Sequence, residues 1–335
     1  MRTQTRLAYN AFLAQVALLN GVPSAVEKFA VDPTVQQTLE AKIQESSDFL
    51  SRINIISVTD QQGEKVGLGV GGPIASTANT TLADRTTKSP TDTTGSTYIC
   101  TQTNYDTHIT YAMLDQWAKF PNFQILVRDA ILRRQALDRI LMGFNGTIRA
   151  ATSDLVANPL LQDVNIGWLQ KYRTEAPSRV LSDGPSVGAN TINVGAGGDY
   201  QNMDALVFDA VNNLIDPWFR GDTNLVAVVG RNLLTDKYLP LLNQLAPTEK
   251  LAADMIISQN RLGGMQAVSV PFMPDGKILV TRLDNLSIYT QEGARRRTII
   301  DNAKRDRIEN YESSNDAYVI EDFGAGCLIE NIVLV

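Results

Sequence analysis

Residues 71–98, GGPIASTANTTLADRTTKSPTDTTGSTY, are the segment that most restricts how this chain can fold. Nine of these residues are threonine, and large apolar side chains are almost absent. Loops longer than about 12–15 residues are uncommon in compact domains and are usually either functional or without fixed structure. The rest of the chain must therefore form its core without this segment, and the segment needs its own explanation.

Strand-like patterns flank the Thr-rich segment on both sides. NIISV (54–58) and EKVGLGV (64–70) predict strands, and from Ile99 to Tyr111 β-branched and aromatic residues alternate along one face. We therefore expect a hairpin-like excursion from about residue 55 to residue 111. An isolated hairpin is marginal in water. This one has few apolar residues of its own, so we expect another subunit to supply the surface on which it lies.

The composition is that of a soluble globular protein, with 335 residues, 44% of them apolar, and a net charge of −6. A protein that grips phosphates is normally basic, so the charge disfavours tight nucleic-acid binding. Cys100 and Cys327 are too few for a disulfide framework or a zinc site, and we expect reduced thiols. No apolar run is long enough to span a membrane, and we interpret the N-terminal segment as an amphipathic helix rather than a signal peptide.

Helical patterns occupy the N-terminal third. Apolar residues from Leu7 to Leu19 recur at helical spacing, and a second helix starts with Asp32 as N-cap and Pro33 in its first turn. These two helices look like an arm that packs on something else. A long helix runs from Pro121 to the glycines at 143–146, which gives a strut about 35 Å long.

From about residue 190 the pattern becomes α/β. LVAVVG (225–230) is typical of a buried strand, and a turn at Pro274–Gly276 joins strands at 267–270 and 277–281. NLSIYT predicts one more strand, and the tail, DAYVIEDFGAGCLIENIVLV, predicts two closing strands around the glycines at 324–326.

The sequence contains no convincing catalytic or cofactor-binding motif. Gly67 to Gly72 match the dinucleotide pattern, but Pro73 and the Thr-rich segment follow where a helix must begin. The single histidine, His108, lies inside an alternating strand pattern. Acidic residues between 309 and 322 predict a solvated face. The run Arg295–Arg297 fits a solvated face, salt bridges between subunits, or nucleic-acid contact. We therefore expect no enzyme, cofactor or metal.

Eight segments carry a resemblance to the major capsid proteins of the P2-like family of tailed bacteriophages, which have the Hong Kong 97-type fold. They are TRLAYNAFLAQVALLNG, QESSDFLSRINI, LDQWAKFPNFQILVRDAILRRQALDRILMGFNG, NPLLQDVNIGWLQKYRTEAP, DALVFDAVNNLIDPWF, LAADMIISQ, LDNLSIY and RDRIENYESSNDAYVIEDFGAGCLIE. The resemblance spans nearly the whole chain, except the Thr-rich tip (about 76–96) and a loop at about 181–196.

The resemblance implies an α+β fold in named parts. These are an N-terminal arm (1–54), an extended β-hairpin loop (55–111), a peripheral domain with the strut helix (112–189), an axial α/β domain (190–305) and returning strands of the peripheral domain (306–335). It also implies pentamers and hexamers that form an icosahedral shell around double-stranded DNA, which the shell contacts weakly and without sequence specificity. Expected partners are an internal scaffold protein, its protease and a portal protein, with assembly in the bacterial host cytoplasm, a final location in the virion, and no membrane.

By the same resemblance, the protease would remove about residues 1–30 by cutting near Phe29, Ala30 and Val31, which we expect to be an exposed segment between helices. Cations on the loop, the strut and the basic run are candidate contacts between subunits: Lys65, Arg85, Lys88, Arg128, Arg134, Arg295, Arg296 and Arg297. Two alternatives stay open, an encapsulin-like protein shell and a soluble α/β enzyme.

Overall fold

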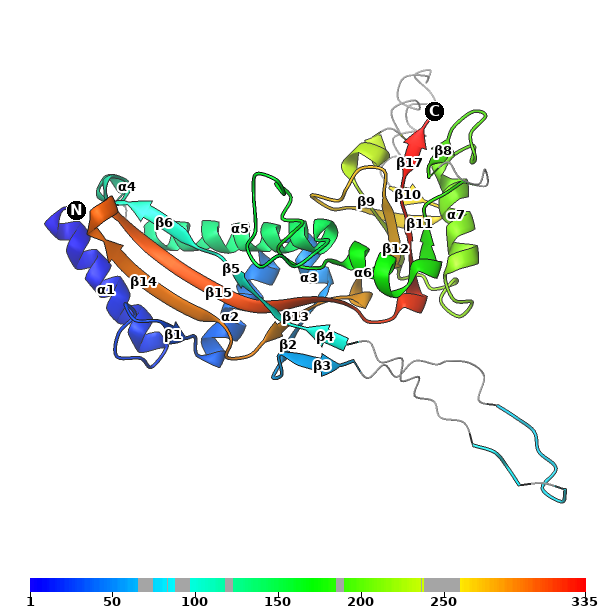
Figure 1. Cartoon of the computed structure of the whole chain (residues 1–335), viewed down its shortest axis with the longest axis horizontal. Helices are drawn as coiled ribbons and strands as arrows, with labels where there is room; N and C mark the ends of the chain where they lie inside the picture. Colours follow the sequence, from blue (N-terminus) through cyan, green and yellow to red (C-terminus); the bar gives the residue numbers. More distant parts are fainter. Residues whose placement is uncertain are drawn as a thin grey trace, which may run out of the picture.

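The computed structural model describes residues 1–65, 75–82, 84–87, 97–117, 123–184, 190–235, 237 and 260–335. Figure 1 shows an elongated part, built on a long curved sheet with a helix alongside it, and a second sheet at one end. The N-terminus lies at the far end of the elongated part, and the C-terminus lies beyond the second sheet. A narrow two-stranded base, β3 (Gln62–Glu64) with β4 (Thr97–Ile99), leads from the elongated part into the Thr-rich segment.

The large sheet is organised around one strand, β15 (Arg307–Ile320). On one side β15 pairs antiparallel with β14 and β13; on the other it pairs antiparallel with β5 and β6. β1 extends the sheet beyond β14, and β2 runs parallel to β13. The bounds are β1 Phe29–Ala30, β2 Asn54–Val58, β5 Thr101–Asn104, β6 Thr107–Thr110, β13 Leu286–Gln291 and β14 Arg296–Asn302.

Helices pack on the large sheet around a buried tryptophan. Trp168 is fully buried, and its ring stands edge-on to those of Phe144, Tyr318 and Phe49, with centroids 5.3, 5.2 and 6.2 Å away. Its indole N–H donates to the carbonyl of Ser287, 3.1 Å away. The core is therefore shared by the sheet and by several helices that are far apart in sequence. These helices are α2 Pro33–Glu45, α3 Asp48–Arg52, α5 Phe123–Asn145 and α6 Trp168–Glu175.

The second sheet has the order β10-β11-β9-β12-β16-β7, with β9 buried along its whole length. α7 (Met203–Leu214) shares an apolar core with this sheet, and Asn202 caps the helix by accepting from the backbone N–H of Ala205. β17 (Ile332–Leu334) pairs with β8 (Ile192–Val194) in a separate parallel ribbon. The remaining bounds are β7 Val180–Leu181, β9 Leu225–Val229, β10 Arg261–Leu262, β11 Met265–Ser269, β12 Ile278–Arg282 and β16 Gly326–Ile329. Short 3₁₀ turns occupy Pro177–Arg179, Leu283–Asn285, Ala303–Arg305 and Phe323–Ala325.

The stretch from residue 99 to residue 111 differs from its expectation as one strand of an excursion. It forms parts of β4, β5 and β6, and Tyr111 begins α4 (Tyr111–Trp117). β2, β5 and β6 all belong to the large sheet, so the excursion begins after β2 and ends before β5. The reason is that alternation identifies a strand but not its partner. The predicted strand at 64–70 lies outside the described residues from residue 66 onward.

The N-terminal helices pack on their own chain, which corrects the expectation that they serve as an arm on something else. α1 (Thr3–Leu19) buries Tyr9 and Val16 in a small apolar cluster with Ile299 and Ile308 of the large sheet. The helix expected from residue 33 onward is interrupted at 46–47 and continues as α3, whose Leu50 is fully buried.

The two sheets divide the chain differently from the expected boundary at residue 305. β13 and β14, expected in the axial part, pair in the large sheet, whereas β16, expected among the peripheral strands, pairs in the second sheet. β11 and β12 are joined in sequence, but β9 lies between them. β14 and the first half of β15 were missed, because their many charged residues conceal the alternation.

Candidate assembly surfaces

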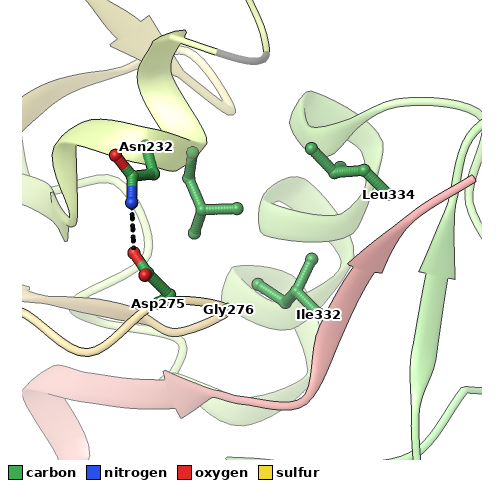
Figure 2. Close-up of a pocket in the computed structure, with 6 residues that line it drawn as sticks. Asn232, Asp275, Gly276, Ile332 and Leu334 are labelled. Atoms are coloured by element: carbon green, nitrogen blue, oxygen red, sulfur yellow. Dashed lines mark hydrogen bonds between the residues drawn. The ribbon is translucent and has the colours of Figure 1, made fainter.

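The hollows in the described surface offer no reaction centre. Figure 2 shows the first, of about 310 Å³, where the Asn232 amide donates to the Asp275 carboxylate at 3.0 Å beside Ile332 and Leu334. Its two polar side chains satisfy each other, and none of its six lining residues forms a nucleophile–base pair. A second hollow, of about 340 Å³, lies on the large sheet, with Lys28, Asp106 and Arg296 among its lining residues.

The side chains that most often act in catalysis, cysteine and histidine, are buried or isolated in the described part of the chain. Cys100 and Cys327 are free and buried, and burial raises the pKa of each thiol to about 12. His108 is exposed on β6, opposite Glu309 of β15. No cluster suited to a metal ion occurs among the described residues, and no helix there is long and apolar enough to cross a membrane. The glycines at 67–72 lie outside that part.

A set of polar contacts fastens α1 to the tip of the large sheet. Arg6 forms a salt bridge to Asp301 of β14, and the Tyr111 hydroxyl donates to the same carboxylate. The Thr5 hydroxyl donates to Asp115 of α4 at 2.7 Å. α1 leaves Leu18 75% exposed on its outer side. The N-terminal segment is therefore docked on the body through one face while it presents apolar side chains outward.

The segment expected to be cut, Phe29 to Val31, is paired with a strand, and of its three side chains only that of Ala30 is exposed. Phe29 and Ala30 form β1 at the edge of β14, and the backbone N–H of Val31 donates to the carbonyl of Arg295 at 2.8 Å. The side chains of Phe29 and Val31 are buried in the cluster beneath α1. A protease needs an extended, accessible chain, so this segment has to leave β14 before it can be cut.

The base of the Thr-rich excursion is tied to the body by close contacts. The ring of Tyr98 lies against Gly63, where a Cβ would be 2.7 Å from its hydroxyl, and stands edge-on to Tyr289 with centroids 5.0 Å apart. The Lys65 ammonium donates to the carbonyl of Ile320 at 2.6 Å, and partial burial lowers its pKa. Lys65, a candidate contact between subunits, thus already has a partner in its own chain.

Most of the other candidate cations are exposed. Arg128 and Arg134 lie on the outer side of α5, within 2.7 Å of Asp129 and Asp138 respectively, and remain largely exposed. Arg85 and Arg296 are exposed as well. Such exposed groups are free to contact a neighbouring molecule. Lys88 lies outside the described residues, and Arg297 is half-buried against the Asn310 amide oxygen.

Arg295 is 1% exposed and lies inside the chain, which corrects its assignment as a contact between subunits. It donates to Glu40 of α2 at 2.6 Å and to Glu312 of β15 at 2.5 Å. The acidic residues expected on a solvated face are likewise buried at Glu309, Glu312 and Asp316. The three acidic residues are spread along one strand, β15, but the charges of a sequence do not reveal which strands and helices will pack against them.

A surface loop between α5 and α6 exposes apolar side chains on a well-braced backbone. The Asp154 carboxylate accepts from the backbone N–H of Val156 at 2.9 Å, and Asp163 accepts from the N–H of Asp154 at 2.7 Å. Val156 is 94% exposed and Leu155 is 65% exposed. Exposed apolar side chains gathered in one place are typical of protein–protein contact sites. The sequence pattern did not indicate this loop.

Comparison with known proteins identifies the architecture. The whole chain superposes on 99% of a chain in the solved structure titled "Satellite phage P4 procapsid including size determination (Sid) protein", with a TM-score of 0.84 and 49% identity. The capsid protein of Escherichia phage P2 is 52% identical over 99% of this chain and 95% of its own length. The major capsid protein of Serratia phage KSP20 is 44% identical over 99% of this chain and 97% of its own length.

These relationships define the class of protein as a bacteriophage capsid shell protein with the Hong Kong 97-type fold, as the sequence predicted. The model of the family described as "Phage major capsid protein, P2 family" matches residues 8–332. The chain belongs to that family. It is a structural component of the virion that assembles with copies of itself into a shell.

Proposed function

We propose that the chain forms pentamers and hexamers that close into an icosahedral shell around a double-stranded DNA genome. The observation that carries this proposal is the match of the whole chain to a procapsid subunit at 49% identity. Contacts that repeat around five- and six-fold rings allow one kind of chain to close a shell, and many modest contacts engaged together give high avidity. The net charge of −6 fits a shell that holds DNA without binding it tightly.

In this proposal the large sheet with α2, α3, α5 and α6 is the peripheral domain, and the second sheet with α7 is the axial domain. The sheet pairings support this division, which assigns β13 and β14 to the peripheral part and β16 to the axial part. The Thr-rich segment at the end of the β3–β4 base is the loop that lies across a neighbouring subunit. Its small, polar and β-branched residues keep it soluble before assembly.

The proposal includes partners beyond the chain itself. An internal scaffold protein helps to build the shell in the host cytoplasm, and its protease trims the N-terminal segment near Phe29–Val31. Since β1 is paired with β14, cutting follows the release of α1 and β1 from the tip of the large sheet. A portal protein occupies one vertex, and the shell expands by rigid-body rearrangement of its subunits when DNA is packaged.

The experiment that tests the loop assignment removes residues 76–96 and replaces them with a short turn. The variant and the intact chain are each produced with the scaffold protein and compared by analytical sedimentation and negative-stain microscopy. We expect the variant to fold and to stop at monomers or rings, because the contact across the neighbouring subunit is gone. Closed shells formed by the variant as efficiently as by the intact chain would show that the loop is dispensable.

A further inference from the structure

Five ionisable side chains are buried together between the large sheet and the helices that cover it. They come from α2, α5, the residue before β14, and β15, so the cluster joins four segments that are distant in sequence. None is more than 6% exposed: Glu40, Arg139, Arg295, Glu312 and Asp316. Because an unpaired buried charge is very unfavourable, the partners of each carboxylate decide its charge state.

Glu40 and Glu312 are fully matched by the two guanidinium groups. Arg139 donates to both oxygens of Glu40, at 2.5 and 3.1 Å, and Arg295 donates to Glu40 Oε1 at 2.6 Å. Arg295 also donates twice to Glu312 Oε1, at 2.8 and 2.5 Å, while Gln135 donates to Oε2 at 3.3 Å. These two carboxylates balance the two positive charges.

Asp316 is the carboxylate left over. Its Oδ2 accepts from the Ser314 hydroxyl at 2.8 Å, but the nearest guanidinium nitrogen, Nη2 of Arg139, is 3.5 Å away. Its Oδ1 has no hydrogen-bond partner, and neither has Nε of Arg139. Its cross-strand neighbours Thr101 and Thr290 also carry buried hydroxyls without partners. An ionised carboxylate at this position would therefore lack most of the donors that it requires.

Among the described residues, the charged and titratable groups that face Asp316 from neighbouring elements compensate its charge only in part. Those facing it from the neighbouring elements are Arg139 of α5, Glu40 of α2, Arg295 before β14, Tyr105 between β5 and β6 with its hydroxyl 3.5 Å from Oδ2, and Cys100 before β5. With three carboxylates and two guanidinium groups ionised, these five side chains would carry one net negative charge. Half-buried Arg297 acts on Glu312, whose pKa it lowers, and is not among the main influences on Asp316. The binding of one proton makes the cluster of five side chains neutral.

We propose that Asp316 is a buried proton-binding site, occupied at neutral pH, and that the bound proton makes the cluster neutral, so that it holds α2 and α5 on the large sheet. When the proton is lost to solvent, an uncompensated charge remains at the point where these elements meet, and the packing of α2 and α5 on the sheet weakens. Burial, which outweighs the opposing attraction of Arg139 and is reinforced by repulsion from Glu40, raises the pKa of this carboxyl group. The inference goes beyond shell formation and holds whether or not the chain assembles.

The sign of the pH effect distinguishes Asp316 from its neighbours. When the pKa of a carboxyl group is higher in the folded chain than in the unfolded chain, its contribution to the stability of the folded chain decreases as pH rises. For Asp316 this decrease begins at the unfolded pKa, near 3.8, and ends at the folded pKa. Glu40 and Glu312 have lowered pKa values, so their contribution is present above about pH 4.5 and is lost as pH falls. Asp106 and Asp138 also have raised pKa values, so the part of a decline above pH 5 that Asp316→Asn removes is the part that reports on Asp316.

The test compares urea unfolding of the full chain with that of Asp316→Asn between pH 5 and 9, at concentrations that keep both monomeric. Asparagine keeps the shape but cannot ionise. We expect the unfolding constant of the wild type to rise relative to the variant by about tenfold per pH unit until the folded pKa is reached. Asp48→Asn, at an exposed position of α3, should follow the wild type. Parallel curves for the wild type and Asp316→Asn would overturn the proposal.

A second measurement needs no folded variant. Infrared spectra of the native wild type at pH 7 should contain the carbonyl stretch of one protonated carboxylic acid, which disappears on unfolding in urea at the same pH. In the unfolded chain every carboxyl group is ionised at that pH. If the native spectrum contains only carboxylate bands at pH 7, Asp316 does not hold a proton and the proposal is wrong.

Discussion

At the scale of single residues, the features that distinguish this chain are its buried charges. Glu40 is 6% exposed and is the only carboxylate of the buried cluster that contacts both Arg139 and Arg295. It anchors the N-terminal helices to the body through side chains that no apolar pattern reveals. Replacing a buried ion pair by apolar residues can be neutral, whereas the removal of one partner strands the other charge.

Glu40→Gln should therefore destabilise the chain strongly, because it leaves two buried guanidinium groups to share the single charge of Glu312. We expect a loss of about 3–5 kcal/mol in the free energy of unfolding, measured by urea denaturation. Glu45→Gln, an exposed position on the same helix, is the matched control and should change stability by less than about 0.5 kcal/mol. A loss below about 1 kcal/mol for Glu40→Gln would show that the cluster does not hold α2.

At the scale of elements, α5 and α6 meet without room for another atom. A Cβ built on Gly143 of α5 would lie 2.3 Å from the indole ring of Trp168, and one on Gly167 would lie 2.4 Å from the carbonyl oxygen of Gly143. The two helices thus approach closely because glycines occupy the crossing. The ring of Trp168 is fully buried and is held by its hydrogen bond to the carbonyl of Ser287.

Gly143→Ala tests this crossing. Alanine favours an isolated helix by about 1 kcal/mol over glycine, so propensity alone predicts stabilisation. Overpacking against Trp168 opposes it, and we expect a net loss of about 1–3 kcal/mol by thermal or urea unfolding. Gly221→Ala, where a Cβ would meet nothing within 4 Å, should be near neutral. Stabilisation by Gly143→Ala would mean that the helices separate easily.

The N-terminal helix gives a second prediction at this scale. Asp301→Ala removes the acceptor shared by Arg6 and Tyr111 and should loosen α1 without unfolding the body. We expect faster backbone hydrogen exchange in α1 and β1, and faster proteolysis near Phe29–Val31, while the exchange of β13 stays unchanged. Asp48→Ala, which removes an exposed ion pair in α3, is the control. Unchanged exchange in α1 would show that the apolar cluster alone holds the segment.

Helices and strands with clear periodicity could be predicted from the sequence, but the strands and helices against which they pack could not. The strut helix, α7 and β9 were each identified, because their apolar residues follow one period over a sufficient length. β14 and the start of β15 were missed because charged residues occupy inward positions, where only a partner strand or helix neutralises them. The resemblance to a family gave the fold that local patterns left open, but it did not indicate that Phe29–Val31 is paired.

At the scale of the whole molecule, the body is elongated, and the candidate contact surfaces lie on separate parts of it (Figure 1). The α1 segment lies at one end, the base of the excursion leaves one side, and the loop between α5 and α6 projects beside α5. A frame with separate contact surfaces suits a chain that touches several neighbours at once. Surface changes should then affect assembly without affecting folding.

Val156→Asp tests the exposed loop. Since the side chain is 94% exposed, the monomer should lose less than about 0.5 kcal/mol of stability, whereas shell yield should fall severalfold because a charge enters an apolar contact. Ser153→Asp, an exposed position in the same loop, adds the same charge outside the apolar tip and is the control. Equal shell yields from the two variants would place the tip outside any contact between subunits.

The measurement that tests the central claim most directly is the production of the intact chain together with its scaffold protein, followed by sedimentation and electron microscopy of the product. We predict closed icosahedral particles whose subunits match this fold and are arranged as pentamers and hexamers. A chain that stays monomeric with its scaffold at every concentration tested would contradict the assignment as a shell-forming protein.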